Sequence, residues 1–207
     1  MAKLQDIIQW CDQTLKSTEF KDYAPNGLQI EGKTEVRKIL AAVTASQDAI
    51  DAAIRENADL LLVHHGYFWK GEAYPITGMR GKRIKSLIQH DISLLAYHLP
   101  LDSHPSLGNN AAIADLLKLE RIEALDPSER HPIGNIGYLN QPMPVEEFKK
   151  FVSEKLKFDV THLPADKTMI EKVGFCTGGA QDFIVKAAEQ DCDAYISGEV
   201  SERTFYE

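Results

Sequence analysis

The order of apolar and amphipathic segments between residues 38 and 65 constrains the fold of this chain most strongly. Lys38–Val43 has the pattern of a strand, the segment from Thr44 to about Asn57 that of a helix, and Asp59–Val63 that of a second strand. Thr44, with Gln47 three residues later, predicts a capping box at the start of this helix. Two strands joined through a helix pair in parallel, so the sequence predicts an α/β fold.

A further helix and strand extend this sheet and bring histidines to one of its edges. A helix from about Lys82 to His90 leads into the strand Ile92–Tyr97, which His98 follows directly. The earlier strand Asp59–Val63 ends in the same way, in the pair His64-His65. Open α/β sheets place their ligand sites at the carboxyl ends of parallel strands. We therefore expect the two histidine segments to meet there.

The second half of the chain repeats the strand–helix–strand pattern of the first. With one extra residue in the second loop, residues 177–199 align with residues 44–65. Five positions are identical, and they pair Gln47, Asp48, Ile50, Ala53 and Asp59 with Gln181, Asp182, Ile184, Ala187 and Asp193. Coincidence between two unrelated units of this kind is the alternative. We expect two similar three-layer α/β halves with largely parallel sheets, related by a pseudo-two-fold.

Charged, proline-containing sequence from about Arg121 to Gly134 predicts a domain boundary. We place a first α/β domain at residues 1–128 and a second at residues 129–207. In the repeat, His65 aligns with Glu199, but the chain stops at Glu207 before any counterpart of the segment from His98 to Asp102. We expect the second domain to be truncated at its C-terminus.

Composition excludes several classes of protein. The formal net charge of -8 disfavours sequence-independent binding of nucleic acid. The three cysteines lie far apart and form no CxxC pair, which argues against disulfides and thiolate zinc sites and for a reduced, cytoplasmic protein. No signal peptide is recognisable, and no apolar run approaches the roughly 20 residues that cross a bilayer.

The residues at the sheet edge have the chemistry of a metal site. Imidazole and carboxylate are ligands that first-row divalent metals prefer, so His64, His65 and Asp102 are candidate ligands. An isolated histidine pair is more often an ordinary surface or core feature, and the second cluster favours metal. His98 either shuttles a proton, as its ordinary pKa near neutrality allows, or hydrogen-bonds behind the ligands. Glu199 has the same two alternatives.

Several motifs together resemble a known family. They occupy residues 26–29, 62–66, 97–102, 108–110, 174–179 and 195–199. With them, essentially the whole chain resembles the NIF-three-like dinuclear metal-centre family, whose members are often labelled GTP cyclohydrolase type-two homologues. The resemblance implies a two-domain α/β subunit in a toroidal homohexamer, with two divalent ions per subunit.

The resemblance also assigns ligands. Matched onto this chain, they are His64, His65 and Asp102, with His98 close by. The family's remaining ligands, a His and a Glu spaced i, i+4, fall in a C-terminal segment that this sequence lacks, so we expect fewer than two tightly held ions here. Zn, Fe, Mn, Ni and Mg are not distinguished by the pattern.

Two functions remain open at this point. The leading hypothesis is a dinuclear metal-dependent hydrolase that acts on a nucleotide-like or phosphorylated small molecule, with the family label implying GTP cyclohydrolase-type activity. The chain has no Gly-x-x-x-x-Gly-Lys phosphate loop, and Gly178-Gly179 either binds an anion or forms a tight turn. The alternative is a non-catalytic metal-binding hexameric scaffold or regulatory interaction protein. An open coordination position would favour catalysis.

Overall fold

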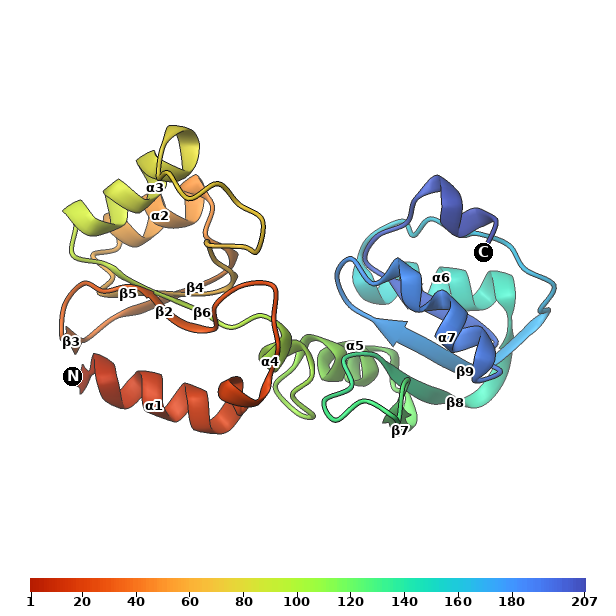
Figure 1. Ribbon diagram of the computed structural model, residues 1–207. Helices are drawn as coiled ribbons and strands as arrows, with labels where there is room; N and C mark the ends of the chain where they lie inside the picture. Colours follow the sequence, from red (N-terminus) through yellow and green to blue (C-terminus); the bar gives the residue numbers. More distant parts are fainter. The chain divides into compact units, whose positions relative to one another are not determined.

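The computed structural model describes residues 1–207, which divide into two compact units. The first unit is Met1–Leu101 and the second is Asp102–Glu207. The elements of the first unit (Figure 1) are β1 (Ala2–Lys3), α1 (Leu4–Leu15), β2 (Gly27–Ile30), β3 (Glu35–Val36), β4 (Ile39–Thr44), α2 (Gln47–Arg55), β5 (Leu60–His65), α3 (Gly78–Gln89) and β6 (Ser93–Ala96). A short helix, α4 (Leu99–Asp102), contains the point of division.

The main sheet of the first unit has the strand order β2-β6-β5-β4. Strands β4, β5 and β6 are parallel, as the strand–helix–strand pattern predicts, and β2 adds antiparallel to β6. Helices α2 and α3 cover one face and α1 covers the other (Figure 1). In β5 this burial on both faces explains the continuous apolar run that begins at Leu60.

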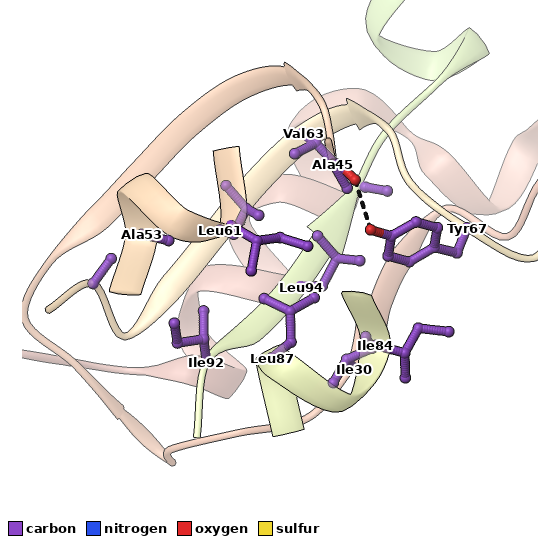
Figure 2. Packing of buried hydrophobic residues seen from close by; sticks show 13 residues of the cluster. Ile30, Ala45, Ala53, Leu61, Val63, Tyr67, Ile84, Leu87, Ile92 and Leu94 are labelled. Atoms are coloured by element: carbon purple, nitrogen blue, oxygen red, sulfur yellow. Dashed lines mark hydrogen bonds between the residues drawn. The ribbon is translucent and has the colours of Figure 1, made fainter. Parts of the chain in front are cut away.

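Two hydrophobic clusters hold these layers together. On the face covered by α2 and α3, Leu61, Leu87 and Leu94 are fully buried (Figure 2). At the edge of this cluster the hydroxyl of Tyr67 donates a hydrogen bond to the carbonyl of Ala45, 2.6 Å away. On the opposite face, α1 contributes Leu4, Ile8 and Cys11 to a second cluster. Fully burying one such aliphatic side chain contributes about 1.5–3 kcal/mol.

The second unit is a mixed α/β structure. Its elements are α5 (Asn109–Leu117), β7 (Glu120–Ala124), β8 (Asn135–Pro144), α6 (Val145–Leu156), β9 (Met169–Cys176), α7 (Ile184–Glu189) and β10 (Ala194–Ser197). The strand order is β10-β9-β8-β7, and only β9 and β10 are parallel. The predicted α/β class is confirmed, but this sheet is less parallel than expected. The chain after α6 returns to the end of β8, where Met169 pairs with Pro144, so β9 runs the opposite way.

The structural division falls earlier than the boundary we placed after residue 128. Strand β7 pairs with β8, and Ala114 and Leu117 of α5 pack in one cluster with Phe148 of α6. Residues 102–128, which we assigned to the first domain, therefore pack with the second unit. None of the helices is both long and apolar enough to cross a membrane.

The internal repeat is visible in the hydrogen bonds of the first unit around Asp59. Its carboxylate accepts from the backbone N–H groups of Arg37 and Lys38, at 2.9 and 3.3 Å. The carboxylate of Asp59 also accepts a hydrogen bond from Nζ of Lys33, at 2.8 Å. Lys33 lies 26 residues before Asp59 in the sequence. Lys38 Nζ in turn donates to the carbonyl of Glu56 at the end of α2.

The second unit repeats this pattern around Asp193. Its carboxylate accepts from the backbone N–H groups of Glu171 and Lys172, and from Nζ of Lys167, again 26 residues before it. Lys172 Nζ donates to the carbonyl of Gln190. Every residue in this set aligns with its counterpart at one constant offset, before and after the helix, which argues against coincidence. The extra residue that we placed in the second loop is therefore wrong, and the structural counterpart of Thr44 is Gly178. The predicted pseudo-two-fold between the halves stays a prediction.

The predicted capping box at Thr44 is wrong. Thr44 is the last residue of β4, and the N-cap of α2 is Ser46, whose hydroxyl accepts from Ala49 N at 3.2 Å. Ser46 has the extended backbone that a cap requires, whereas Thr44 still pairs with His65 of β5.

Candidate metal centre

Three histidines of the first unit lie together at the carboxyl ends of β5 and β6. His64 and His65 are the last residues of β5, and His98 lies two residues after the end of β6. The ring centroids are 4.4 Å apart for His64 and His65, 5.1 Å for His64 and His98, and 5.7 Å for His65 and His98. One potential ligand atom from each residue lies within 4.8 Å of the others. The parallel pairing of β5 and β6 explains this convergence, as expected from the sequence.

Each of these rings has its Nδ1 next to an oxygen atom. The three contacts are His64 Nδ1 to Tyr97 O at 2.9 Å, His65 Nδ1 to Thr44 Oγ1 at 3.3 Å and His98 Nδ1 to Asp22 Oδ1 at 2.7 Å. A carbonyl or carboxylate oxygen only accepts, so the Nδ1 atoms of His64 and His98 donate. This leaves the lone pair of Nε2 available as a metal ligand. Metal-binding histidines characteristically have such oxygen partners behind them. Three half-buried imidazoles of this kind fit a divalent metal.

Asp22 is the charged group behind this cluster. Its side chain is only 3% exposed and accepts hydrogen bonds from the ring of His98, from Asn26 Nδ2 and from the backbone N–H of Leu99. Burial alone would raise the pKa of Asp22, but the hydrogen bonds from His98, Asn26 and Leu99 outweigh it and lower this pKa to about 2. Asp22 is therefore a carboxylate at neutral pH. Sequence analysis did not find it.

The segment from Asn26 to Gln29 joins the two histidine-bearing strand ends. Asn26 Oδ1 accepts from the backbone N–H of His98 at 2.8 Å, and Gln29 Oε1 accepts from that of Tyr67 at 2.7 Å. Gly66 leaves room for this contact, since a Cβ there would lie 2.2 Å from Gln29 Oε1. The sequence predicted a turn and a family motif here, but it did not predict that these side chains bind the backbone beside the histidines.

Trp69 borders the cluster on the loop that follows β5. Its ring meets that of His98 edge-on at 4.9 Å and lies 5.9 Å from that of His65. The indole N–H donates to the carbonyl of Gly66, and the backbone N–H donates to Glu72. The half-buried ring therefore shields one side of the histidines from water. Nothing in the sequence pattern singled it out.

The remaining predicted site residues belong to the second unit. Asp102 is 6% exposed, and its Oδ1 accepts from Asn109 Nδ2 at 2.7 Å and from Thr177 Oγ1 at 3.4 Å. Glu199 is exposed, and its carboxylate packs near Gly179. That Asp102 binds metal with the histidines stays a prediction. The histidine cluster by itself supplies three potential metal ligands.

Comparison with known proteins identifies the family. Residues 2–207 match the family described as Duf34/NIF3 (NGG1p interacting factor 3). The chain belongs to the Duf34/NIF3 family. A Haemophilus influenzae relative named "GTP cyclohydrolase 1 type 2 homolog" is 50% identical over 203 residues, which are 97% of this chain and 80% of the relative. A Vibrio cholerae relative of the same name is 50% identical over 199 residues, which are 94% of this chain and 78% of the relative.

Solved structures of similar proteins agree with this assignment. The protein ybgI, described as of unknown function, matches with a TM-score of 0.93 at 42% identity, over 99% of this chain and 81% of that one. A Thermus thermophilus protein matches with a TM-score of 0.86 at 29% identity, over 99% and 81%. The fold of this Duf34/NIF3 chain is therefore shared with crystal structures of similar proteins.

Proposed function

We propose that this Duf34/NIF3 chain is a metal-dependent hydrolase that binds divalent metal through His64, His65 and His98. The observation that carries the proposal is the convergence of the three imidazoles, two of which donate through Nδ1 and so keep the lone pair of Nε2 available for metal. Substrates of the nucleotide-like or phosphorylated class are supported by the name of the relatives, "GTP cyclohydrolase 1 type 2 homolog". The second ion and the ligand Asp102 rest on the family resemblance.

The residues of the site have separate parts in this proposal. A bound divalent ion supplies Lewis acidity, which polarises a carbonyl or phosphoryl oxygen of the substrate. His64 and His65 would hold the metal, His64 through the Nε2 that its Nδ1 hydrogen bond leaves available. His98 either completes the ligand set or holds a proton at Nε2, with its orientation set by Asp22. Trp69 restricts the access of water from its side of the cluster.

Metal binding is the first test. The purified chain is stripped of metal and titrated separately with Zn²⁺, Mn²⁺, Fe²⁺, Ni²⁺ and Mg²⁺ by calorimetry. We expect His64→Ala to abolish tight binding of the preferred ion and His90→Ala to leave it unchanged, since His90 is an exposed residue at the end of α3. Equal binding by wild type and His64→Ala would contradict the proposed site.

Turnover is tested by incubating the metal-loaded chain with GTP, other nucleotides and simple phosphoesters. The His64→Ala variant serves as the control for hydrolysis that does not depend on the site. Hydrolysis that depends on both metal and His64 supports the proposal. Tight binding without hydrolysis of any of these compounds would instead favour the metal-binding scaffold.

A further inference from the structure

We propose that Asp22 is the positioning residue of the histidine cluster, because its carboxylate holds His98 in the tautomer that carries the proton on Nδ1. The proposal deepens the metal-binding function above and rests on it for its consequence. In this tautomer Nε2 has a lone pair and is directed at the site. Asp22 thereby determines whether His98 offers a lone pair or a proton to whatever occupies the centre.

Four donors surround the carboxylate of Asp22, two on each oxygen. Oδ1 accepts from the ring of His98 at 2.7 Å and from the backbone N–H of Tyr23 at 2.6 Å. Oδ2 accepts from Asn26 Nδ2 and from the backbone N–H of Leu99, both at 2.9 Å. Because Leu99 follows His98 directly, the carboxylate of Asp22 binds both the ring of His98 and the backbone N–H of the next residue. A side chain that is 3% exposed has little freedom to change partners.

This arrangement requires a carboxylate and not an amide. In Asp22→Asn, an amide group on the Oδ2 side would face the donors Asn26 and Leu99. The backbone N–H of Leu99 cannot accept, and Asn26 could accept only by turning over its amide and losing the hydrogen bond from the backbone N–H of His98. On the Oδ1 side it would face Tyr23 and the ring of His98, and only the ring can become an acceptor by moving its proton to Nε2. We therefore expect Asp22→Asn to reverse the tautomer of His98, since an amide behind a histidine favours the wrong tautomer.

The Nδ1 contacts of the other two rings are of a different kind. His64 Nδ1 donates to a backbone carbonyl, that of Tyr97, which no substitution removes. His65 Nδ1 lies beside the hydroxyl of Thr44, which can donate or accept and so leaves the tautomer open. At His98 the partner of Nδ1 is the carboxylate of Asp22, which only accepts and so fixes the proton on Nδ1.

Asp12 supplies a matched control. It lines the same cavity of about 230 Å³ as Asp22, and its carboxylate also accepts hydrogen bonds from side chains. Its partners are the hydroxyls of Ser17 and Tyr97, and none of them is a histidine ring. Asp12→Asn therefore makes the same change of charge beside the same cavity without touching His98.

The tautomer is measured on the metal-free chain by ¹H–¹⁵N spectra of the histidine rings at about pH 8.5, where unperturbed histidines are neutral. We expect a proton on Nδ1 of His98 in wild type and in Asp12→Asn, and on Nε2 in Asp22→Asn. A wild-type ring that is protonated on Nε2 would overturn the proposal, even if Asp22→Asn failed to fold. So would an unchanged tautomer in a folded Asp22→Asn.

The consequence for metal is measured with Zn²⁺ alone, by calorimetry. We expect Asp22→Asn to weaken Zn²⁺ binding about 10–100-fold, as is typical when the hydrogen-bonding partner of a ligand is lost. In the His98→Ala background the same substitution should have no further effect, because Asp22 acts through His98. Equal weakening in both backgrounds would indicate a general structural role and overturn the proposal. Absence of Zn²⁺ binding by wild type would reject the proposed metal function, while the ring spectra would still decide the role of Asp22.

Discussion

In the first unit the strand after α2 ends in His64 and His65, whereas in the second unit the aligned positions after α7 are Gly198 and Glu199. At the other end of the same strands the two units agree closely. Asp59 and its counterpart in the second unit each bind two backbone N–H groups and one lysine in the same geometry.

The comparison separates what builds the strand–helix–strand unit from what makes it a site. The amino ends of the strands carry an aspartate that ties the loop before the first strand to the start of the second. The carboxyl ends differ, and in the first unit three potential metal ligands meet there. The repeat therefore supplies two equivalent frameworks and one histidine cluster.

The largest expected difference concerns metal. His65→Ala should weaken Zn²⁺ binding by more than about 100-fold, because loss of a ligand exceeds the effect of losing a ligand's hydrogen-bonding partner. Glu199→Ala at the aligned position should change it by less than about twofold, because no cluster of potential ligands includes Glu199. Calorimetric titration of both variants checks this. Similar losses in the two variants would show that the second unit contributes to the site.

The two units should also differ in packing at the position after this pair, which is Gly66 in the first unit and Val200 in the second. A Cβ on Gly66 would lie 2.2 Å from Gln29 Oε1 and 2.7 Å from Ala96 Cβ, so Gly66→Ala should cost about 1–3 kcal/mol of unfolding free energy. The aligned residue Val200 is 48% exposed, and Val200→Ala should stay within about 0.5 kcal/mol.

Urea denaturation measures both changes. The two tryptophans, Trp10 and Trp69, lie in the first unit, so their fluorescence reports on it separately. A Gly66→Ala variant as stable as wild type would mean that Gln29 moves aside at no cost.

The shared framework predicts a smaller difference between the two aspartates. Asp59→Asn should cost about 1.5–3 kcal/mol, the usual contribution of hydrogen bonds to a charged group, and Asp193→Asn should cost less. The reason is exposure, since the side chain of Asp59 is 10% exposed and that of Asp193 is 20% exposed. Chemical denaturation of the two single variants measures both losses of unfolding free energy. A larger loss in Asp193→Asn would contradict the explanation by exposure.

Acid should act on the same two groups. The hydrogen bond from Lys33 lowers the pKa of Asp59. Burial of Asp193 would raise its pKa, but the hydrogen bonds from Lys172 and Lys167 outweigh burial and lower it. Because both folded-state pKa values lie below the unfolded value near 4, this stability is present above about pH 4 and is lost as the pH falls through the folded values. Stability in this range should fall less steeply in Asp59→Asn.

The smallest expected effect lies at the start of the helices. Ser46→Ala removes the N-cap of α2 and should cost about 1 kcal/mol. The aligned residue is Ala180, whose φ of -101° and ψ of 28° differ from the extended backbone of Ser46. Ala180→Ser should therefore gain no more than a few tenths of a kcal/mol, because its hydroxyl is not held in the capping position. A gain near 1 kcal/mol, measured by thermal or chemical denaturation, would show that the second helix can accept the same cap.

Features with a periodic signal were predictable from the sequence. The alternation of apolar strands and helices predicted the parallel strands β4, β5 and β6, and this topology brings His64, His65 and His98 together. The antiparallel course of β9 was not predicted, because the direction of a strand depends on where the preceding connection returns.

Asp22 could not be found in this way. It is a single acidic residue in an irregular segment, and its partner His98 lies 76 residues later. Nothing in its neighbours marks it, and its importance comes only from burial among four donors. Trp69 was missed for a similar reason, since an aromatic residue after a strand is equally common in cores and on surfaces.

The sequence separation of these contacts has a consequence for the order of folding. His64 and His65 are covalent neighbours, but His98 is held by residues 72 and 76 positions earlier, and Tyr67 by Gln29, 38 positions earlier. Such long loops close only after the local helices and strands have formed, because closing them costs chain entropy first. We therefore expect the complete cluster to form late in folding, after the local helices and strands of the first unit.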